Sequence, residues 1–208
     1  SRVTSVRFRN VPSFVLESGM SIEVDGRPLS VDISFGGAFY ASVRVGDVGL
    51  SVQPKHLNEL IRIGRAVKSA IHERLEVVHP LEPELRDVYG VIFFEDVHPI
   101  EKGAGEGDEL VQRNVTIFAD GEVDRSPCGS GTSARLALLD ADRTLARGRT
   151  LRHLGILDTA FVATVVGDAA VGTIAGVVTE VEGSASPTGR HHFVLDPDDP
   201  VGTGFLLR

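Results

Sequence analysis

Cysteine is nearly absent from this sequence, with one residue, Cys128, among 208. A single thiol excludes a disulfide within the chain and any metal centre built from several of its cysteines. Low cysteine use fits a reducing compartment, which predicts a cytoplasmic location. The N-terminus also lacks the charged and then apolar pattern of a secretory leader, which adds to that expectation.

Long apolar runs and basic clusters are absent as well. No segment is long and apolar enough to cross a bilayer, so no membrane contact is expected. The formal charge is -8, and Lys and Arg are not clustered, which argues against a nucleic-acid partner. The hydrophobic fraction of 42% is ordinary for a globular protein. A chain of this length buries a sizeable core in one large domain or two small ones.

Short strands are predicted in the first half of the chain. Ser21–Val24 and Leu29–Phe35 flank Asp25–Pro28, a glycine-containing turn suited to a hairpin. Apolar residues alternate with polar ones in the second of these strands and again over Phe39–Val45, as expected of half-buried strands. The pair Gly36-Gly37 between them predicts a bulge or a close backbone approach.

Two helices are predicted. Leu57–Leu75 carries apolar residues at three- and four-residue steps, which is typical of an amphipathic helix. Cys128–Ala146 is apolar on more than one face and is therefore expected to be buried. Further strands are predicted at Val88–Phe94, Asn114–Phe118, Phe161–Val166, Ile174–Val181 and Phe193–Leu195, with a solvated loop at Glu101–Glu109 and a surface tail at Asp196–Pro200. The fold class expected is α+β, a curved mixed sheet or barrel around a central helix that starts at Cys128.

The single thiol stands at the first turn of the predicted buried helix. Unpaired backbone N–H groups and the helix dipole favour an anion there, so we expect the pKa of Cys128 to fall from about 8.5 toward neutrality. The N–H groups of Gly129, Ser130 and Gly131 can bind a carboxylate or phosphate. Asp124, four residues upstream, can face a cationic group on the same ligand. This pattern indicates an amino-acid zwitterion as ligand.

Other interpretations of the same residues stay open at this point. A lone cysteine is often a small buried hydrophobe, and Ser-Pro-x-Gly is a common helix start. Gly129-Ser130-Gly131 resembles a phosphate-binding loop, but no lysine follows at the position that such a loop requires. A cysteine hydrolase needs a histidine near Cys128, and nothing in the sequence singles one out. His191-His192 would point to opposite sides of a strand, so no metal site is predicted. His153 is expected to be a packed histidine rather than one that orients a bound ligand.

Five blocks of the sequence resemble the proline racemase family. Asp124–Arg135 (Asp-Arg-Ser-Pro-Cys-Gly-Ser-Gly-Thr-Ser-Ala-Arg) is very similar to the family signature around its second catalytic cysteine. Three other blocks agree in order and spacing: Asn10–Val15, Val31–Tyr40 and Arg113–Phe118. The final block, Phe193–Pro200 followed by Gly204-Phe205, agrees as well. The resemblance covers nearly the whole chain.

The resemblance implies the fold of diaminopimelate epimerase. That fold has two α/β domains, each a curved sheet around a central helix, with the active site between them. The chain then corresponds to the C-terminal catalytic half of the family. Residues 1–15 would be a connector from a missing N-terminal domain, residues 16–190 the second domain, and residues 191–208 a C-terminal return segment.

The resemblance also implies a reaction, the racemisation or epimerisation of proline or 4-hydroxyproline at Cα. Cys128 would be one of two thiols that act on opposite faces of the substrate. Asp124 would hold the ring ammonium, the amides of Gly129 and Ser130 would bind the carboxylate, and Phe118 would pack against the ring. No metal, pyridoxal phosphate or nicotinamide cofactor is implied.

The sequence departs from the family pattern in two places. The other family cysteine lies in a Met-Cys-Gly-His motif upstream of Asn10, where only nine residues precede and none is cysteine. Transfer between two faces needs a base on each, so a missing N-terminal domain or a second subunit, as in a homodimer, would supply the other base. This chain alone is expected to be inactive. The stretch His153–Thr159 differs from the His-Glu-Ser of many members, which affects substrate specificity.

Two alternative functions are kept. The first is a trans-3-hydroxyproline dehydratase, a lyase of the same family; such members typically carry threonine at the position of Cys128, which favours the isomerase. The second is a catalytically incomplete imino-acid-binding domain. It would bind an analogue such as pyrrole-2-carboxylate without exchanging the Cα hydrogen.

Overall fold

The computed structural model describes residues 3–97 and 109–204. The predicted loop Glu101–Glu109 lies outside the described residues, except for Glu109, which begins a strand. No helix in the described ranges is long and apolar enough to span a membrane.

The described residues form one ten-stranded mixed sheet and two α-helices. The strands are β1 (Val6–Arg9), β2 (Ser13–Val24), β3 (Arg27–Phe35), β4 (Phe39–Arg44), β5 (Val88–Asp96), β6 (Glu109–Phe118), β7 (Glu122–Val123), β8 (Thr150–Leu154), β9 (Ala160–Val171) and β10 (Ile174–Gly183). The helices are α1 (Leu57–His72) and α2 (Gly129–Ala141). Two 3₁₀ turns, η1 (Val45–Val48) and η2 (Pro54–His56), precede α1.

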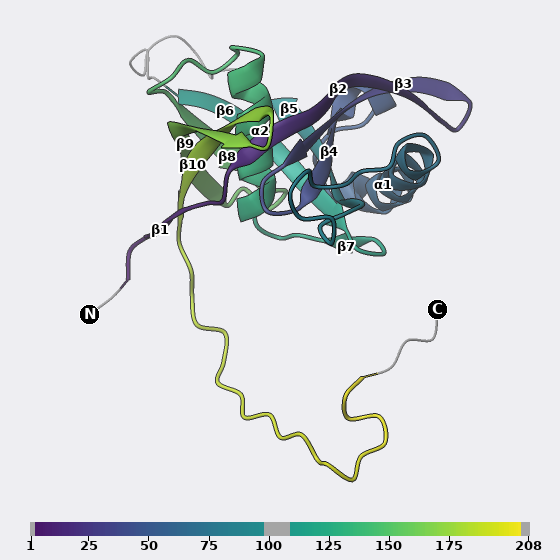
Figure 1. Ribbon diagram of the computed structural model, residues 1–208, viewed down its shortest axis with the longest axis vertical. Helices are drawn as coiled ribbons and strands as arrows, with labels where there is room; N and C mark the ends of the chain where they lie inside the picture. The colour runs from purple at the N-terminus through teal and green to yellow at the C-terminus, as the bar shows by residue number, and fades with distance from the viewer. Residues whose placement is uncertain (1–2, 98–108, 205–208) are drawn as a thin grey trace.

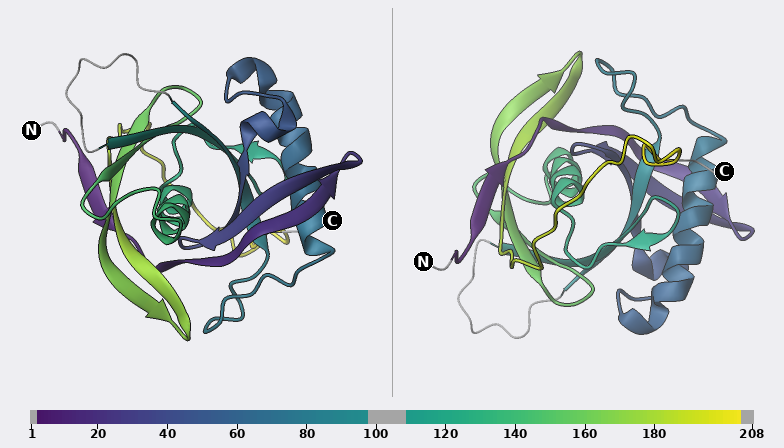
Figure 2. Two further views of the ribbon diagram at one scale, coloured as in Figure 1. Left: turned by 90° about the horizontal axis from the view of Figure 1, so that it is seen from above. Right: turned by 90° about the horizontal axis from the view of Figure 1, so that it is seen from below.

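The sheet closes into a barrel. Its order is β1-β10-β2-β3-β4-β5-β6-β8-β9, and β9 pairs back with β10. Within the described sheet, β4–β5 and β6–β8 are parallel and the other pairs are antiparallel. Figure 2 looks into the barrel and shows α2 enclosed by the strands while α1 lies outside them. The expectation of an α+β barrel around a central helix is therefore confirmed.

The hairpin β2–β3 turns where the sequence predicts, but both strands are longer. Asp25 and Gly26 have φ of 54° and 72°. A two-residue hairpin loop in a type I′ turn requires positive φ at both central residues. β2 begins at Ser13 rather than Ser21. Its register with β3 shifts on both sides of Glu17, so bulges interrupt the alternation that the sequence would otherwise display.

The close approach predicted at the glycine pair is confirmed at Gly36. A Cβ added there would overlap the carbonyl oxygen of Ser130 and lie 2.6 Å from the backbone nitrogen of Ala134. The turn between β3 and β4 therefore packs directly on the first turn of α2. Gly36 thus sets the distance between the barrel wall and the start of the enclosed helix.

Helix α2 ends at Ala141, five residues before the predicted end. The backbone of Arg143 adopts a left-handed conformation with φ of 57°, and the amides of Thr144 and Leu145 donate to the carbonyl of Leu139. This is the hydrogen-bonding of a left-handed helix stop, which glycine usually provides. Because a different residue takes that conformation here, the sequence carries no stop signal.

The predicted strand Phe193–Leu195 is wrong. The chain has no regular structure there, and Phe193 is 88% exposed. Its apolar residues predict a strand, but no described strand lies beside it to pair with. Figure 1 shows this segment leaving the barrel after β10, and the tail Asp196–Pro200 is exposed. Strands β1, β7 and β8 were not predicted, and the proposed division into connector, domain and return segment remains an expectation.

Candidate functional site

The turn before α2 is held by a chain of side-chain hydrogen bonds. The carboxylate oxygen Oδ1 of Asp124 accepts from the backbone nitrogen and the hydroxyl of Ser126, each at 2.8 Å. The Ser126 hydroxyl oxygen in turn accepts from the backbone nitrogen of Cys128 at 3.1 Å. Aspartate favours such a turn because its side chain bonds to the backbone two residues on. The predicted ligand group Asp124 and the thiol are therefore coupled through one serine.

Cys128 itself has a strained backbone, with φ of 65° and ψ of 112°. A positive φ is uncommon for a residue other than glycine and clusters at functional sites. The strain is held in place because the Cys128 carbonyl accepts from Thr132 at 2.8 Å. A Cβ on Gly131 would lie 3.0 Å from the sulfur, so glycine leaves the space that the thiol occupies over the helix start.

The sulfur has polar neighbours on one side and apolar ones on the other. Its thiol donates to the Tyr40 hydroxyl at 3.6 Å, and the Ser130 hydroxyl lies 3.9 Å away. Tyr40 and Ser130 are themselves hydrogen-bonded at 2.7 Å. Cys128 is 8% exposed and packs in a small cluster with Ile92 and Phe94. The thiol is thus largely shielded from solvent but has hydrogen-bonding groups within reach.

Burial raises the pKa of the Cys128 thiol above its ordinary value. The Tyr40 hydroxyl, the Gly131 backbone N–H and the Ser130 hydroxyl favour the thiolate and oppose this rise, whereas the charge of Asp124 adds to it. The predicted fall in the pKa of Cys128 is therefore wrong. Loss of water around the thiolate outweighs the helix start. Burial also raises the pKa of Tyr40, so that its hydroxyl keeps its proton.

A row of aromatic rings connects the sulfur with Phe118. Tyr89 meets Tyr40 edge to face at a centroid distance of 5.9 Å, and Phe118 stacks on Tyr89 at 5.6 Å. Tyr89 is 45% exposed, so part of this row faces solvent. Phe118, predicted to pack against a substrate ring, is therefore separated from the thiol by two aromatic rings. Its role in binding stays a prediction.

Gly129 and Ser130 form the first turn of α2, next to the sulfur. The ring of Phe8 on β1 lies 3.2 Å from the position of a Cβ on Gly129, so β1 covers this end of the helix. The structure brings Asp124, Cys128 and these two residues together in one turn. Tyr40 and Phe8 also belong to this neighbourhood and were not singled out from the sequence.

His153 is a packed residue, as expected. It is fully buried, and its Nδ1 lies 2.8 Å from the hydroxyl of Thr132 in α2. Its Nε2 has no hydrogen-bond partner within residues 3–97 and 109–204. Burial, with the nearby charge of Arg135, lowers the pKa of His153 to about 3. The ring is therefore neutral at physiological pH.

Acidification is expected to remove stability that the neutral His153 ring contributes. The pKa is about 3 in the folded chain against an ordinary 6.5, because burial disfavours the charged ring. This contribution to stability is complete at pH values above the ordinary pKa of 6.5. It is lost as the pH falls from there toward the folded pKa of about 3, because in that range only the unfolded chain takes up the proton. At about pH 5 this amounts to about 2 kcal/mol of unfolding free energy.

Urea denaturation at about pH 8 and about pH 5 measures this effect. Between these two pH values the unfolding free energy should fall by about 2 kcal/mol less in His153→Gln than in the unsubstituted chain. His72→Gln is the matched control, because the side chain of His72 is 75% exposed. Equal pH dependence of the His153 and His72 variants would contradict the assignment.

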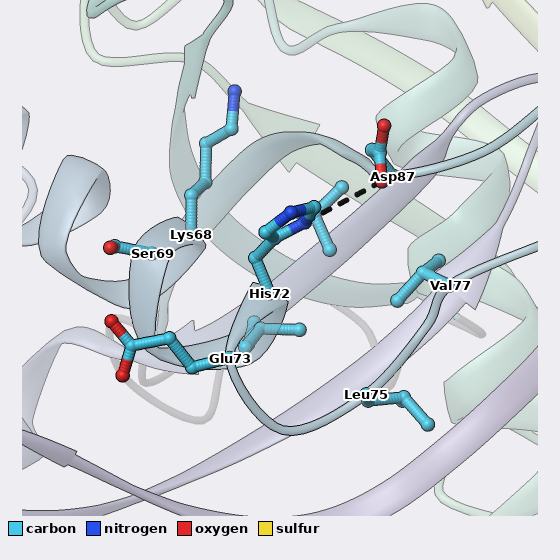
Figure 3. Close-up of a pocket in the computed structure, with 9 residues that line it drawn as sticks. Lys68, Ser69, His72, Glu73, Leu75, Val77 and Asp87 are labelled. Carbon is cyan, nitrogen blue, oxygen red and sulfur yellow. Dashed lines mark ion pairs between the residues drawn. The ribbon is translucent and has the colours of Figure 1, made fainter.

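A cavity of about 480 Å³ lies beside α1 (Figure 3). Lys68, His72, Glu73 and Asp87 are its ionisable groups, and three of them already have partners. The Lys68 ammonium donates to the carbonyls of Tyr89 and Ala119 at 3.1 and 2.8 Å, and His72 lies 3.6 Å from Asp87. Neither a thiol nor a serine paired with a histidine lines this cavity. The candidate functional site is therefore the start of α2.

Several known proteins are similar to this chain over nearly its whole length. The family described as proline racemase matches residues 1–206. A trans-3-hydroxy-L-proline dehydratase of Bacillus cereus is 48% identical over 207 residues, which are 100% of this chain and 60% of that protein. A proline racemase of Clostridioides difficile is 36% identical over 209 residues, with the same coverage of each chain. The chain spans about 60% of the length of these curated relatives.

Two solved structures share the fold. A hydroxyproline epimerase of Agrobacterium vitis, with bound trans-4-hydroxy-L-proline, superposes with a TM-score of 0.85 at 33% identity. The match covers 98% of this chain and 56% of that one. A probable proline racemase of Agrobacterium radiobacter, with bound carbonate, superposes with a TM-score of 0.83 at 31% identity, covering 98% and 57%.

Proposed function

The chain belongs to the proline racemase family, and from this we propose that it is the catalytic half of an enzyme that inverts proline or 4-hydroxyproline at Cα. One observation carries the proposal. The single thiol of the chain sits in a strained backbone conformation at the start of a buried helix, within hydrogen-bonding reach of the Tyr40 and Ser130 hydroxyls. Strain of this kind persists where the surrounding structure enforces it, commonly at active sites.

Cys128 would exchange one proton with the substrate Cα. In one direction its thiolate removes the proton from one face; in the other its thiol returns a proton to that face. The raised pKa makes the thiol the resting form, so Cys128 begins as proton donor. When the sulfur ionises, the Tyr40 hydroxyl, which keeps its proton, turns to donate to it.

The substrate would be held by groups on both sides of the sulfur. The backbone N–H groups of Gly129 and Ser130 suit its carboxylate, because they lie in the first turn of α2, where amides lack helical acceptors. Asp124 would hold the ring ammonium through Oδ2, because Oδ1 already accepts two hydrogen bonds. Phe118 and Tyr89 offer apolar surface for the ring.

The second base would come from outside this chain. Inversion requires a group on each face of Cα, and Cys128 is the only thiol here. The chain spans about 60% of its curated relatives, which is consistent with a missing N-terminal domain. A second subunit, as in a homodimer, is the other source. The complete enzyme, as used below, means this chain together with the part that supplies the second base.

Dehydration of trans-3-hydroxyproline is the second candidate. The relative named for that activity is 48% identical to this chain, against 36% for the one named proline racemase. The two reactions share their first step, removal of the Cα proton. In the dehydratase the C3 hydroxyl then leaves as water, whereas in the isomerase a proton returns to the opposite face.

The complete enzyme in deuterium oxide separates these functions. L-proline, trans-4-hydroxy-L-proline and trans-3-hydroxy-L-proline are supplied in turn, and the products are followed by proton NMR. An isomerase incorporates deuterium at Cα and forms the inverted imino acid, whereas a dehydratase converts only the 3-hydroxy substrate, to a cyclic imine. Binding of pyrrole-2-carboxylate with neither Cα exchange nor formation of the imine would contradict both and leave a binding domain.

A further inference from the structure

A second polar cavity lies against α2 in the barrel, well beyond Cys128. Its volume is about 250 Å³, and the residues that line it include Ser42 on β4, Arg135 on α2 and Asp142 just after α2. Arg135 is seven residues after Cys128, which corresponds to roughly 10 Å along a helix at 1.5 Å per residue. The cavity is therefore separate from the candidate active site, although both contact the same helix.

Arg135 is held in one orientation in this cavity. It is 6% exposed, and its guanidinium lies 3.7 Å from the centroid of the Phe94 ring. Its Nε donates to the side-chain oxygen of Gln112 at 3.1 Å, and the Gln112 amide donates to Asp96 at 2.8 Å. A planar guanidinium fixed in this way presents its remaining edge as a fork suited to a carboxylate.

Several donors in the cavity are unused. The two Nη groups of Arg135 make no hydrogen bond or ion pair with any described residue. The hydroxyl of Ser42, in a side chain only 2% exposed, has no partner among the described residues either. Buried polar groups left unpaired destabilise a protein, so a bound molecule or ordered water is expected to complete them.

The charges around the fork favour a ligand with both signs. The carboxylates of Asp32, Asp96 and Asp142 lie close enough to influence Arg135 electrostatically. Asp96 is already paired with Arg44 at 2.8 Å, and Oδ1 of Asp32 accepts from the Gly19 backbone at 2.8 Å. Among the described residues, Asp32, Asp47 and Asp142 line the cavity without a cation in an ion pair. These carboxylates would repel a simple anion, and Arg135 would repel a simple cation.

We propose that this cavity binds a small amino acid as its zwitterion. The carboxylate pairs with the Arg135 fork and the Ser42 hydroxyl, and the ammonium faces Asp32 and Asp142. A volume of about 250 Å³ falls below the roughly 300–1,000 Å³ of sites for drug-sized ligands, which suits a molecule the size of alanine. The site is independent of the proposed reaction and of Cys128.

Amide-resolved NMR of the chain tests this site with three probes: L-alanine, acetate and ethylamine. L-alanine carries both charges, and each of the others carries one. L-alanine is expected to shift the backbone amides of Ser42, Phe94 and Arg135 in a saturable manner, and to bind more tightly than either single-charge probe. Shifts confined to Cys128–Ser130 would place the amino acid at the candidate active site and overturn the proposal.

Two variants and a matched control locate the contacts. Ser42→Ala is expected to weaken L-alanine binding about threefold to tenfold, as loss of one hydrogen bond does. Arg135→Lys keeps the charge but loses the fork, and should weaken binding about tenfold or more. Ser34→Ala should leave it unchanged, because Ser34 is equally buried and unpartnered but does not line the cavity.

Three outcomes would overturn the proposal. The first is the absence of saturable shifts at Ser42, Phe94 and Arg135, which would leave ordered water alone in the cavity. The second is acetate binding as tightly as L-alanine, which would remove the role of the carboxylates. The third is equal affinity in Ser42→Ala and Ser34→Ala. Ser42→Ala removes only an unpaired hydroxyl, so the test does not depend on whether Arg135→Lys folds.

Discussion

Replacing Cys128 by serine is expected to lower Cα hydrogen exchange in the complete enzyme by at least a hundredfold, and up to about ten-thousandfold, the range for loss of a general acid or base. Serine keeps the size and hydrogen-bonding capacity of the side chain. Its hydroxyl, however, does not ionise near the pH at which a thiol does, so the proton on this face has no acceptor. Proton NMR in deuterium oxide measures the exchange directly.

The folded state should survive this substitution. The serine hydroxyl can occupy the place of the thiol between Tyr40 and Ser130, so unfolding free energy in urea should change by less than about 1 kcal/mol. Loss of activity without loss of stability assigns the effect to chemistry. Exchange above about a tenth of the original rate in Cys128→Ser would contradict the role of the thiol as a proton carrier.

Replacing Tyr40 by phenylalanine is expected to raise the pKa of the Cys128 thiol further. The Tyr40 hydroxyl favours the thiolate, and a hydrogen bond to a charged group contributes about 1.5–3 kcal/mol. The rate of Cys128 alkylation by iodoacetamide at fixed neutral pH should fall about tenfold or more, because less thiolate is present. The pH dependence of this alkylation should move to higher pH.

Tyr89→Phe is the matched control for this substitution. Tyr89→Phe also removes one hydroxyl and keeps the ring that packs against Tyr40. The Tyr89 hydroxyl makes no hydrogen bond to the sulfur among the described contacts. The alkylation profile of Tyr89→Phe should overlay that of the unsubstituted chain. In the complete enzyme, Tyr40→Phe should lower kcat with little change in KM, since the Tyr40 hydroxyl contacts the sulfur and the Ser130 side chain, not the backbone amides proposed to bind the carboxylate. Identical pH profiles for the two variants would contradict the role of Tyr40.

Local patterns in the sequence predict much of this barrel. The hairpin turn at Asp25-Gly26 and the helices α1 and α2 follow from turn chemistry and apolar spacing, which act within a few residues. The strand β8 and the helix stop at Arg143 do not follow from them. β8 belongs to the sheet because β6 and β9 flank it, and Arg143 takes a conformation that its residue type does not announce.

The candidate site shows the same division between local and long-range effects. The position of Cys128 at a helix start follows from the sequence, since the Ser-Pro-Cys-Gly stretch is local. Its pKa does not, because the direction is set by burial among Tyr40, Ile92 and Phe94, which come from distant strands. No sequence rule brings Tyr40 beside Cys128; only the closed sheet around α2 does so.

Closure of the barrel by its last strand has a consequence for how the chain folds. β10 pairs with both β1 and β2, so Val177 meets Ser13 near the opposite end of the chain. Such distant pairing slows folding, because the entropy of closing a long loop is lost before contacts form. Until β10 arrives, Leu136 and Leu139 of α2 lack the cover of Val181. During synthesis, α2 therefore emerges with an apolar side exposed, and β10, which is made after it, protects it from association.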